Sequence, residues 1–156
     1  MSDNLTHLDD EGRARMVDVG GKGESRRLAI AESLVEMSAA TRDLMFDGTL
    51  PKGDAVSVAR VAGLMAAKRT ADLIPLCHPL RLSHSRVDIE PHELGARIVA
   101  RVEAVDRTGV EMEAMIAASV AALTVYDMIK GIERGAHISV TRLIHKSGGK
   151  SGEWNR

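Results

Sequence analysis

RIVARVEAVDRTGVEMEAMIAASVAALTVYDMIK, residues 97–130, places a strand directly before the longest helix that the sequence predicts. In residues 97–106, the apolar residues at even positions from 98 to 104 alternate with Val99, Arg101 and Glu103. Alternation of this kind is typical of a strand with one buried face. The long apolar stretch 111–130 is followed by a glycine, a common helix terminator. The stretch therefore predicts a strand–helix unit.

Two further strands are predicted on either side of this unit. Residues 83–91 form the first, joined to 97–106 by a turn at Pro91–Gly95, and residues 138–145 form the last. Residues 26–37, RRLAIAESLVEM, are ambiguous, because their apolar positions fit both an alternating strand and a helical stripe. Periodicity alone leaves that segment open.

The middle of the chain predicts another helix and a loop. Residues 54–69 begin with Asp54, a suitable N-cap, and carry a helical stripe. The stripe consists of Ala55, Val58, Ala59, Ala62 and Met65. Residues 70–80 hold two of the four prolines, so we expect a structured loop there.

The fold class predicted is α+β. If residues 26–37 are a strand, the order is β-α-β-β-α-β, the ferredoxin-like arrangement of an antiparallel sheet with both helices on one face. We expect one domain over residues 1–156, with a flexible arm at 1–15 and a flexible tail at 146–156.

Composition excludes several classes of function. The 156 residues include one Phe, one Trp and one Tyr, too few to stack on single-stranded nucleic acid. A net charge of −1 gives no general attraction to DNA or anionic lipid, and a single cysteine excludes an internal disulfide framework. The uncharged run Ala114 to Tyr126 is shorter than the roughly 20 residues that span a bilayer. We expect a cytoplasmic protein with no nucleic-acid or membrane partner.

The core is expected to be modest, because 20 alanines supply little apolar area per residue. An oligomer that buries further surface is therefore a reasonable expectation. The basic residues are also unusual, since 15 are arginines and only 6 are lysines, several of them beside glycine. A lysine offers a compact charge and an amine that can titrate. This pattern indicates a site that binds an anion and handles protons.

Cys77 and His78 are adjacent in a segment held by two prolines. Neighbouring residues in an extended chain point to opposite sides, so they make a poor nucleophile–base pair. A metal would need a further ligand, for which His84 is the nearby candidate. We favour a small cysteine beside a histidine that contacts substrate, with no metal.

The helix 111–130 carries charges that serve a site. Asp127 gains nothing from the negative end of the helix dipole, yet it lies three residues before Lys130, where an ion pair can form. Glu113 lies about 21 Å from Asp127 along a continuous helix. One small substrate cannot readily reach both within one chain, so the sequence predicts a pocket shared between subunits.

Several segments together resemble the MoaC family, the cyclic pyranopterin monophosphate synthases of molybdenum cofactor biosynthesis. The resemblance covers nearly the whole chain and is most specific at DLIPLCHPL, residues 72–80. The other matching segments are MVDVGGKGESRR at 16–27, GTLPKGD at 48–54, ARVAGLMAAKRT at 59–70, TGVEMEAM at 108–115, SVAALTVYDMIK at 119–130 and KSGGKSG at 146–152.

The resemblance implies a lyase that converts 3′,8-cyclo-7,8-dihydroguanosine triphosphate to cyclic pyranopterin monophosphate and diphosphate. It also implies a ferredoxin-like fold in which residues 26–37 are a strand. The expected assembly is a hexamer, built as a trimer of dimers with active sites at dimer interfaces. We expect no required cofactor, although Mg²⁺ can accompany the triphosphate.

By the same resemblance, Asp127, Lys52 and Lys130 match the catalytic residues. The residues that match substrate-binding positions are Leu76, Cys77, His78, Met112, Glu113, Lys68, Lys146 and Lys150, and we add Glu111 beside them. Our hypothesis is that Lys52 and Lys130 transfer protons, with a lysine pKa lowered by like-charged neighbours, while Asp127 orients Lys130 or takes a proton itself. The alternative is a non-catalytic, regulatory nucleotide- or phosphate-binding module.

Overall fold

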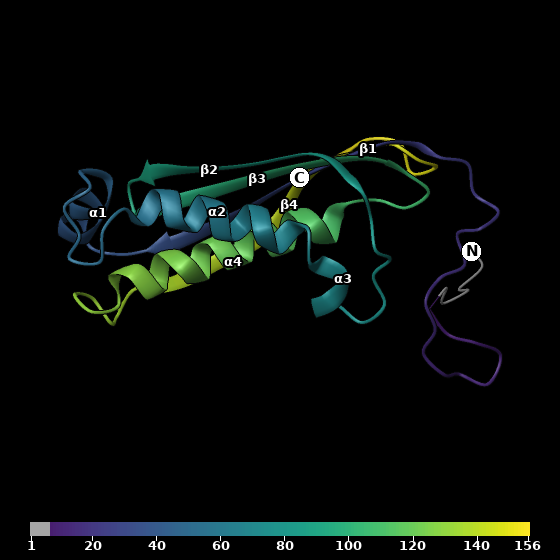
Figure 1. Cartoon of the computed structure of the whole chain (residues 1–156), viewed down its shortest axis with the longest axis horizontal. Helices are drawn as coiled ribbons and strands as arrows, with labels where there is room; N and C mark the ends of the chain where they lie inside the picture. Colours follow the sequence, from purple (N-terminus) through teal and green to yellow (C-terminus); the bar gives the residue numbers. More distant parts are fainter. Residues whose placement is uncertain (1–6) are drawn as a thin grey trace.

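The computed structural model describes residues 7–156, which form one five-stranded antiparallel sheet with helices on one of its faces (Figure 1). The strand order is β2-β3-β1-β4-β5. The strands are β1 (Ser25–Glu36), β2 (Leu82–His92), β3 (Gly95–Asp106), β4 (His137–Ser147) and β5 (Trp154–Asn155), and the helices are α1 (Ala39–Phe46), α2 (Ala55–Ala67), α3 (Thr70–Leu73) and α4 (Glu111–Ile129).

The predicted ferredoxin-like order is confirmed, because the ambiguous segment 26–37 forms the central strand β1. β1 pairs with β3 from Ser25↔Asp106 to Glu36↔Gly95, and its other edge pairs with β4. A strand with neighbours on both sides can pair most of its backbone groups, here with two irregularities in the register against β4. That pairing, which periodicity does not reveal, decides between strand and helix for this segment.

Helices α2 and α4 lie against one face of the sheet and against each other (Figure 1). Their contact is close because small residues meet there. Gly63 of α2 faces Ala121 and the carbonyl oxygen of Ala117 in α4, and a Cβ built on Gly63 would lie 2.9 Å from that oxygen. Alanine-rich helices therefore pack tightly, at the cost of burying little area per residue.

The stripe predicted on α2 is partly wrong. Asp54 caps the helix as expected, since its side chain accepts from Ser57 N. The buried positions, however, are Ala55, Ala59, Gly63, Ala66 and Ala67, whereas Val58 is 48% exposed and Met65 is 54% exposed. Because the small residues face α4, the larger ones are left on the outer side of the helix.

The local structure differs from the prediction in the 70–80 loop, in an added helix, in the tail and in the arm. Residues 70–80 are not loop throughout, because residues 70–73 form the short helix α3 before Pro75. Helix α1 has no counterpart in the sequence prediction. The tail expected over 146–156 instead begins within β4 and ends in β5, which pairs with β4. Of the arm expected at 1–15, residues 1–6 lie outside the described residues, and Leu8 bridges to Ala14.

On the sheet face away from α2 and α4, two nearly buried glutamates are each held by two arginines. Glu32 accepts from Arg97 and Arg142, both at 2.8 Å. Burial alone would raise the pKa of Glu32, but these hydrogen bonds outweigh it and hold the pKa below its usual range. Glu103 is held in the same way by Arg26 and Arg101, which lower its pKa.

Helix α4 is long and apolar enough to cross a membrane by length and composition alone. Its packing accounts for that character, because its alanines and Val125 are fully buried against the sheet and α2.

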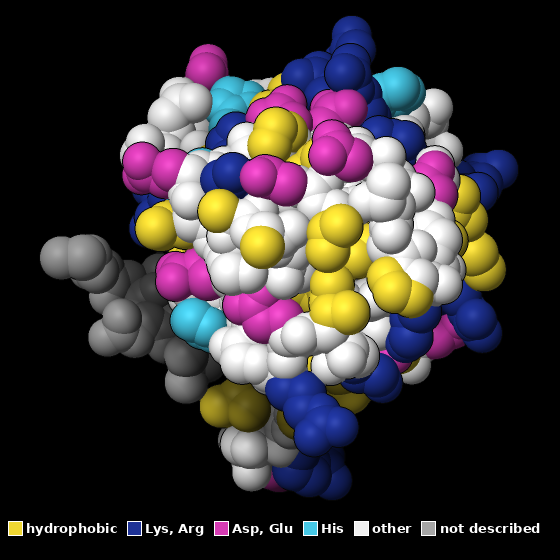
Figure 2. Space-filling model, turned by 90° about the vertical axis from the view of Figure 1, so that its left-hand side faces the viewer, with side chains coloured by type: hydrophobic (Ala, Val, Ile, Leu, Met, Phe, Trp, Pro, Cys, Tyr) yellow, Lys and Arg dark blue, Asp and Glu magenta, His cyan; other side chains and the backbone are white. Residues whose placement is uncertain are grey.

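Figure 2 views the end of the molecule that carries α1, where hydrophobic side chains lie in separate patches among acidic and basic ones. Leu44 and Ile132 are among the exposed apolar residues at this end.

Candidate functional site

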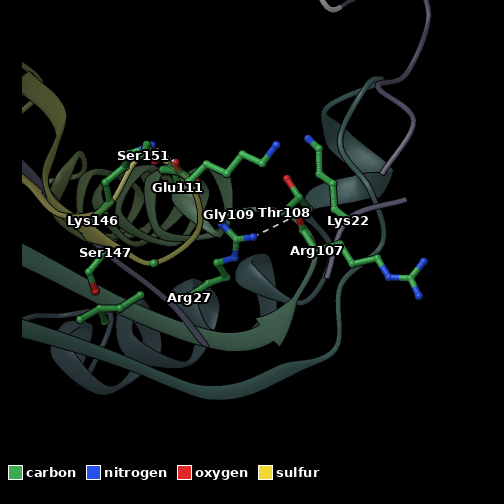
Figure 3. Close-up of a pocket in the computed structure, with 12 residues that line it drawn as sticks. Lys22, Arg27, Arg107, Thr108, Gly109, Glu111, Lys146, Ser147 and Ser151 are labelled. Carbon is green, nitrogen blue, oxygen red and sulfur yellow. Dashed lines mark hydrogen bonds and ion pairs between the residues drawn. The ribbon is translucent and has the colours of Figure 1, made fainter. Parts of the chain in front are cut away.

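A basic cavity of about 270 Å³ lies where β1 begins and β4 ends (Figure 3). Its lining includes five basic side chains and one acidic side chain, Glu111. The basic residues are Lys22, Arg27, Arg107, Lys146 and Lys150. Lys146 Nζ donates to Glu111 Oε1 at 2.7 Å, which neutralises one charge of each sign. The remaining excess of positive charge is suited to a multiply charged anion.

Arg27 is central to the construction of this cavity. Its Nε and Nη2 donate to the carbonyl oxygens of Asp106 and Arg107, each at 3.2 Å, which ties β1 to the loop before α4. Figure 3 shows the contact with Arg107. The guanidinium of Arg107 points away from the other labelled side chains in Figure 3, and it donates to Gly20 O at 3.2 Å. Arg27 thus holds one wall of the cavity in place.

A second cavity of about 370 Å³ adjoins the first. The two share four lining residues, which are Lys22, Thr108, Gly109 and Glu111. The second cavity adds an apolar and weakly polar lining, made up chiefly of Val17, Val19, Leu76, Cys77, His78, Leu80, Met112 and Glu113. A single elongated ligand can therefore place a charged part in the basic cavity and a heterocycle in the second one.

Glu113 is a buried carboxyl group in the wall of the second cavity. It is 4% exposed, and burial raises its pKa to about 7, with help from the nearby charges of Glu111 and Asp106. Burial also raises the pKa of the Cys77 thiol, and the charge of Glu113 adds to the effect. Cys77 is therefore a protonated thiol at neutral pH, unlike an activated nucleophile.

His78 is oriented by the N-terminal segment. Its Nε2 lies 2.8 Å from Val17 O, and because a carbonyl oxygen only accepts, Nε2 carries the proton. His84, the further ligand considered for a metal at Cys77 and His78, lies on β2 and is absent from the cavity lining. Among residues 7–156, no three side chains of His, Cys, Asp or Glu are grouped as a metal site requires.

A separate cluster lies at the other end of α4, where Asp127 contacts two lysines. Lys130 Nζ lies 2.7 Å from Asp127 Oδ1, the ion pair that their spacing predicts. Lys52 Nζ lies 3.4 Å from Asp127 Oδ2 and donates to the Asp127 carbonyl oxygen at 2.6 Å. All three side chains are about half exposed. The lysine ahead of α2 and the end of α4 are thus brought together by the packing of the two helices.

The expectation of a lowered lysine pKa is wrong for Lys130 in this chain. The hydrogen bond and charge of Asp127 raise the pKa of Lys130. In turn Lys130, followed by Lys52, lowers the pKa of Asp127, which argues against Asp127 as a proton acceptor in this arrangement. Lys130 is therefore a charged ammonium group, and Asp127 is an ionised carboxylate.

The structure divides the predicted site residues between two places. One group lines the two adjoining cavities, namely Leu76, Cys77, His78, Glu111, Met112, Glu113, Lys146 and Lys150. The cluster of Lys52, Asp127 and Lys130 lies at the opposite end of α4, and Lys68 is an exposed C-cap of α2 that lines neither cavity. Sequence reasoning missed Lys22 and Arg27 as lining residues, although the GGKGES segment and its adjacent arginines were a usable signal.

The fold and the site together define a class: a ferredoxin-like α+β protein with a basic cavity joined to a more apolar one. Comparison with known proteins is more specific. The model of the MoaC family matches residues 16–149, and the chain belongs to the MoaC family.

Its relatives include proteins named cyclic pyranopterin monophosphate synthase. The one from Thermomicrobium roseum is 56% identical over 154 residues, which are 97% of this chain and 93% of the relative. Those from Brucella ovis and Chloroflexus aggregans are 54% and 55% identical over 156 residues, covering 99% of this chain and 94% of each relative.

Proposed function

We propose that this protein is a cyclic pyranopterin monophosphate synthase, which rearranges 3′,8-cyclo-7,8-dihydroguanosine triphosphate and releases diphosphate. The observation that carries the proposal is the pair of adjoining cavities, one basic and one with a buried carboxyl group. The triphosphate fits the first by charge, and the guanine-derived heterocycle fits the second. The names of relatives more than half identical to this chain support the same activity.

In this proposal the second cavity binds the heterocycle through hydrogen bonds. The guanine-derived ring presents neighbouring N–H groups, and the Glu113 carboxylate accepts from them. The ligand's N–H groups would offset the cost of burial and lower the pKa of Glu113 from about 7, since hydrogen bonds to a carboxylate favour its charged form. Within residues 7–156 the lining contains no Phe, Tyr or Trp, and its rings are the imidazoles of His7 and His78, so recognition depends chiefly on such polar contacts.

The basic cavity supports loss of diphosphate. To form the cyclic monophosphate, a hydroxyl of the substrate attacks the α-phosphorus, and the bond to the bridging oxygen of the diphosphate breaks. Negative charge then collects on the leaving diphosphate. Lys22, Arg27 and Lys150 line the space where that charge develops and stabilise it.

Lys52, Asp127 and Lys130 are proposed as the catalytic residues for the proton transfers of the ring rearrangement. Asp127 keeps Lys130 protonated and fixes its position, so Lys130 serves first as an acid. Glu113 lies about 21 Å away along α4, so the cluster acts on a substrate bound to a neighbouring subunit. The site is thereby shared between two chains.

The proposed assembly is a hexamer, arranged as a trimer of dimers. The outer side of α2 and α4 supports self-association, because Val58, Val61, Met65 and Leu123 are each roughly half exposed. A groove of about 440 Å³ on the same side is lined chiefly by apolar residues such as Met65 and Val120. Native mass spectrometry tests the proposal, which requires six times the 16.8 kDa chain mass.

We place the enzyme in the cytoplasm, with no required cofactor and with Mg²⁺ entering only as a counter-ion of the triphosphate. A free, uncharged Cys77 is consistent with a reducing compartment. Activity after treatment with EDTA tests the role of the metal. If the protein held a resident metal, EDTA would abolish the activity, and added Mg²⁺ would restore it.

The decisive experiment incubates the purified protein with 3′,8-cyclo-7,8-dihydroguanosine triphosphate and measures diphosphate and pterin product together. We expect both products in equal amounts, and we expect Lys52→Arg to lower turnover because arginine keeps the charge but cannot deprotonate. Full turnover by Lys52→Arg would refute proton transfer by Lys52. Binding of the substrate without any product would identify the regulatory module instead.

A further inference from the structure

The C-terminal hairpin borders the basic cavity but extends beyond it. Ser147, Gly148, Lys150 and Ser151 line the cavity, whereas Trp154, Asn155 and Arg156 line neither cavity. These last three residues form and follow β5, which pairs with the end of β4, with Lys146 opposite Trp154 and His145 opposite Asn155. Their contacts therefore bear on the position of the turn rather than on a ligand directly.

Three side-chain or backbone contacts join residues 155 and 156 to β4, and a fourth joins Arg156 to Trp154. The backbone N and the Nε of Arg156 donate to carbonyl oxygens of β4 at 3.0 and 2.9 Å. Asn155 Oδ1 lies 2.7 Å from Nδ1 of His145, and the guanidinium of Arg156 lies 5.5 Å from the centre of the Trp154 ring. We refer to Trp154, Asn155 and Arg156 as the clasp.

Between β4 and the clasp, the turn formed by residues 148–152 packs closely against β1. Gly148 and Gly149 have φ values of 101° and 71°, in the region that favours glycine. A Cβ at Gly148 would overlap the carbonyl oxygen of Arg26, and one at Gly149 would overlap Nη1 of Arg27. The turn thus rests on the same arginine that holds the opposite wall of the cavity.

We propose that the clasp residues are positioning residues for Lys150. A lysine on a glycine-rich segment loses much conformational freedom when it binds an anion. A turn that is fixed at both ends before binding has less to lose, so the affinity for the anion rises. The inference rests on the proposed function only in taking the substrate's triphosphate as that anion.

The test measures the Kd of inorganic triphosphate by calorimetry at constant ionic strength. The proteins are the full chain, a chain ending at Glu153, Lys150→Ala, and the truncation combined with Lys150→Ala. Each single change is expected to raise Kd about tenfold, the range of one charge-assisted hydrogen bond. The combined change should lie within about twofold of Lys150→Ala alone, because both remove the same contribution.

Two further variants separate positioning from general effects. Arg134→Ala removes a positive charge of an exposed loop outside both cavities and should leave Kd within about twofold. Trp154→Phe keeps a ring under Arg156 and should retain the full affinity. In the proposed reaction, the truncation should lower kcat/KM by no more than Lys150→Ala does, and it should add no further loss to that variant, a pattern that general destabilisation would not give.

Equal Kd values for the full chain and the truncation would overturn the inference, as would effects that multiply in the combined variant. A full chain that does not bind triphosphate would overturn it as well. A full chain that binds triphosphate with the expected pattern of variants, yet releases no diphosphate from the substrate, would refute the proposed function and leave the clasp established.

Discussion

Complementation between two inactive variants tests the sharing of the site directly. The perturbations are Glu113→Gln, in the second cavity, and Asp127→Asn, which removes the counter-ion of Lys52 and Lys130. Each change alone leaves every site defective, and we expect turnover to fall by about 100-fold or more.

The magnitude of recovery follows from the geometry. The two residues lie about 21 Å apart on one rigid helix, so a shared site takes Glu113 from one chain and Asp127 from another. In an equal mixture with free exchange, half of the sites receive an intact Glu113 and half receive an intact Asp127. Roughly a quarter of the sites receive both, whatever the number of dimers in the assembly.

The assay combines the two variants by co-expression, confirms mixed oligomers by native mass spectrometry, and measures diphosphate release. Recovery to roughly a quarter of wild-type turnover supports the shared site. Mixed oligomers that remain as inactive as either parent would refute the reasoning. The double variant, Glu113→Gln with Asp127→Asn in one chain, is the matched control, because its mixture with either parent restores no intact site.

Three further predictions concern stability. The pKa of Glu113 is raised to about 7, so between pH 4.5 and 7 the folded chain binds more protons than the unfolded chain, and ionisation of Glu113 lowers stability as pH rises. Chemical unfolding should therefore find Glu113→Gln more stable than wild type by about 2–3 kcal/mol at pH 8 but not at pH 4. An equal difference at both pH values would contradict this. Glu32 has a lowered pKa, so the contacts of its carboxylate with arginines stabilise the fold above pH 4.5, and this stabilisation is lost as pH falls. Glu32→Gln should therefore lower the free energy of unfolding by about 1–2 kcal/mol at pH 7 and leave it unchanged near pH 2. Gly63→Ala should cost about 1–2 kcal/mol, because its Cβ would lie 2.9 Å from Ala117 O, whereas Gly131→Ala, with open space around it, should change the free energy of unfolding by less than about 0.5 kcal/mol.

Much of the order of strands and helices was predictable because most elements carry their own periodic pattern; residues 26–37 and helix α1 are the exceptions. Alternation in 97–106 and the helix 111–130 needed no tertiary information, and both are confirmed. The outward face of α2 was not predictable in the same way. The predicted stripe includes Val58 and Met65, but a close crossing with α4 requires Gly63 and the alanines at the contact. Residue size at a helix crossing, rather than hydrophobicity, decided which side is buried.

For the site, the motif residues around Cys77 and Glu113 were found from the sequence, and the structure brings them together in one cavity. Lys22 and Arg27 were missed because their role depends on where β1 begins relative to the glycine-rich turn. The pKa of Lys130 is raised, opposite to the lowered lysine pKa that we expected in the site, since sequence spacing predicts the contact of Lys130 with Asp127 but not which neighbour outweighs the others.

The sequence by itself determined the fold class, the family resemblance and the scarcity of aromatic rings, because these depend on composition and on local patterns along the chain. Only the tertiary structure decided that residues 26–37 are the central strand, that two cavities adjoin, and that the Asp127 cluster lies at the far end of α4. Those properties arise from contacts between segments distant in sequence, and burial and electrostatic fields depend on the sum of such contacts.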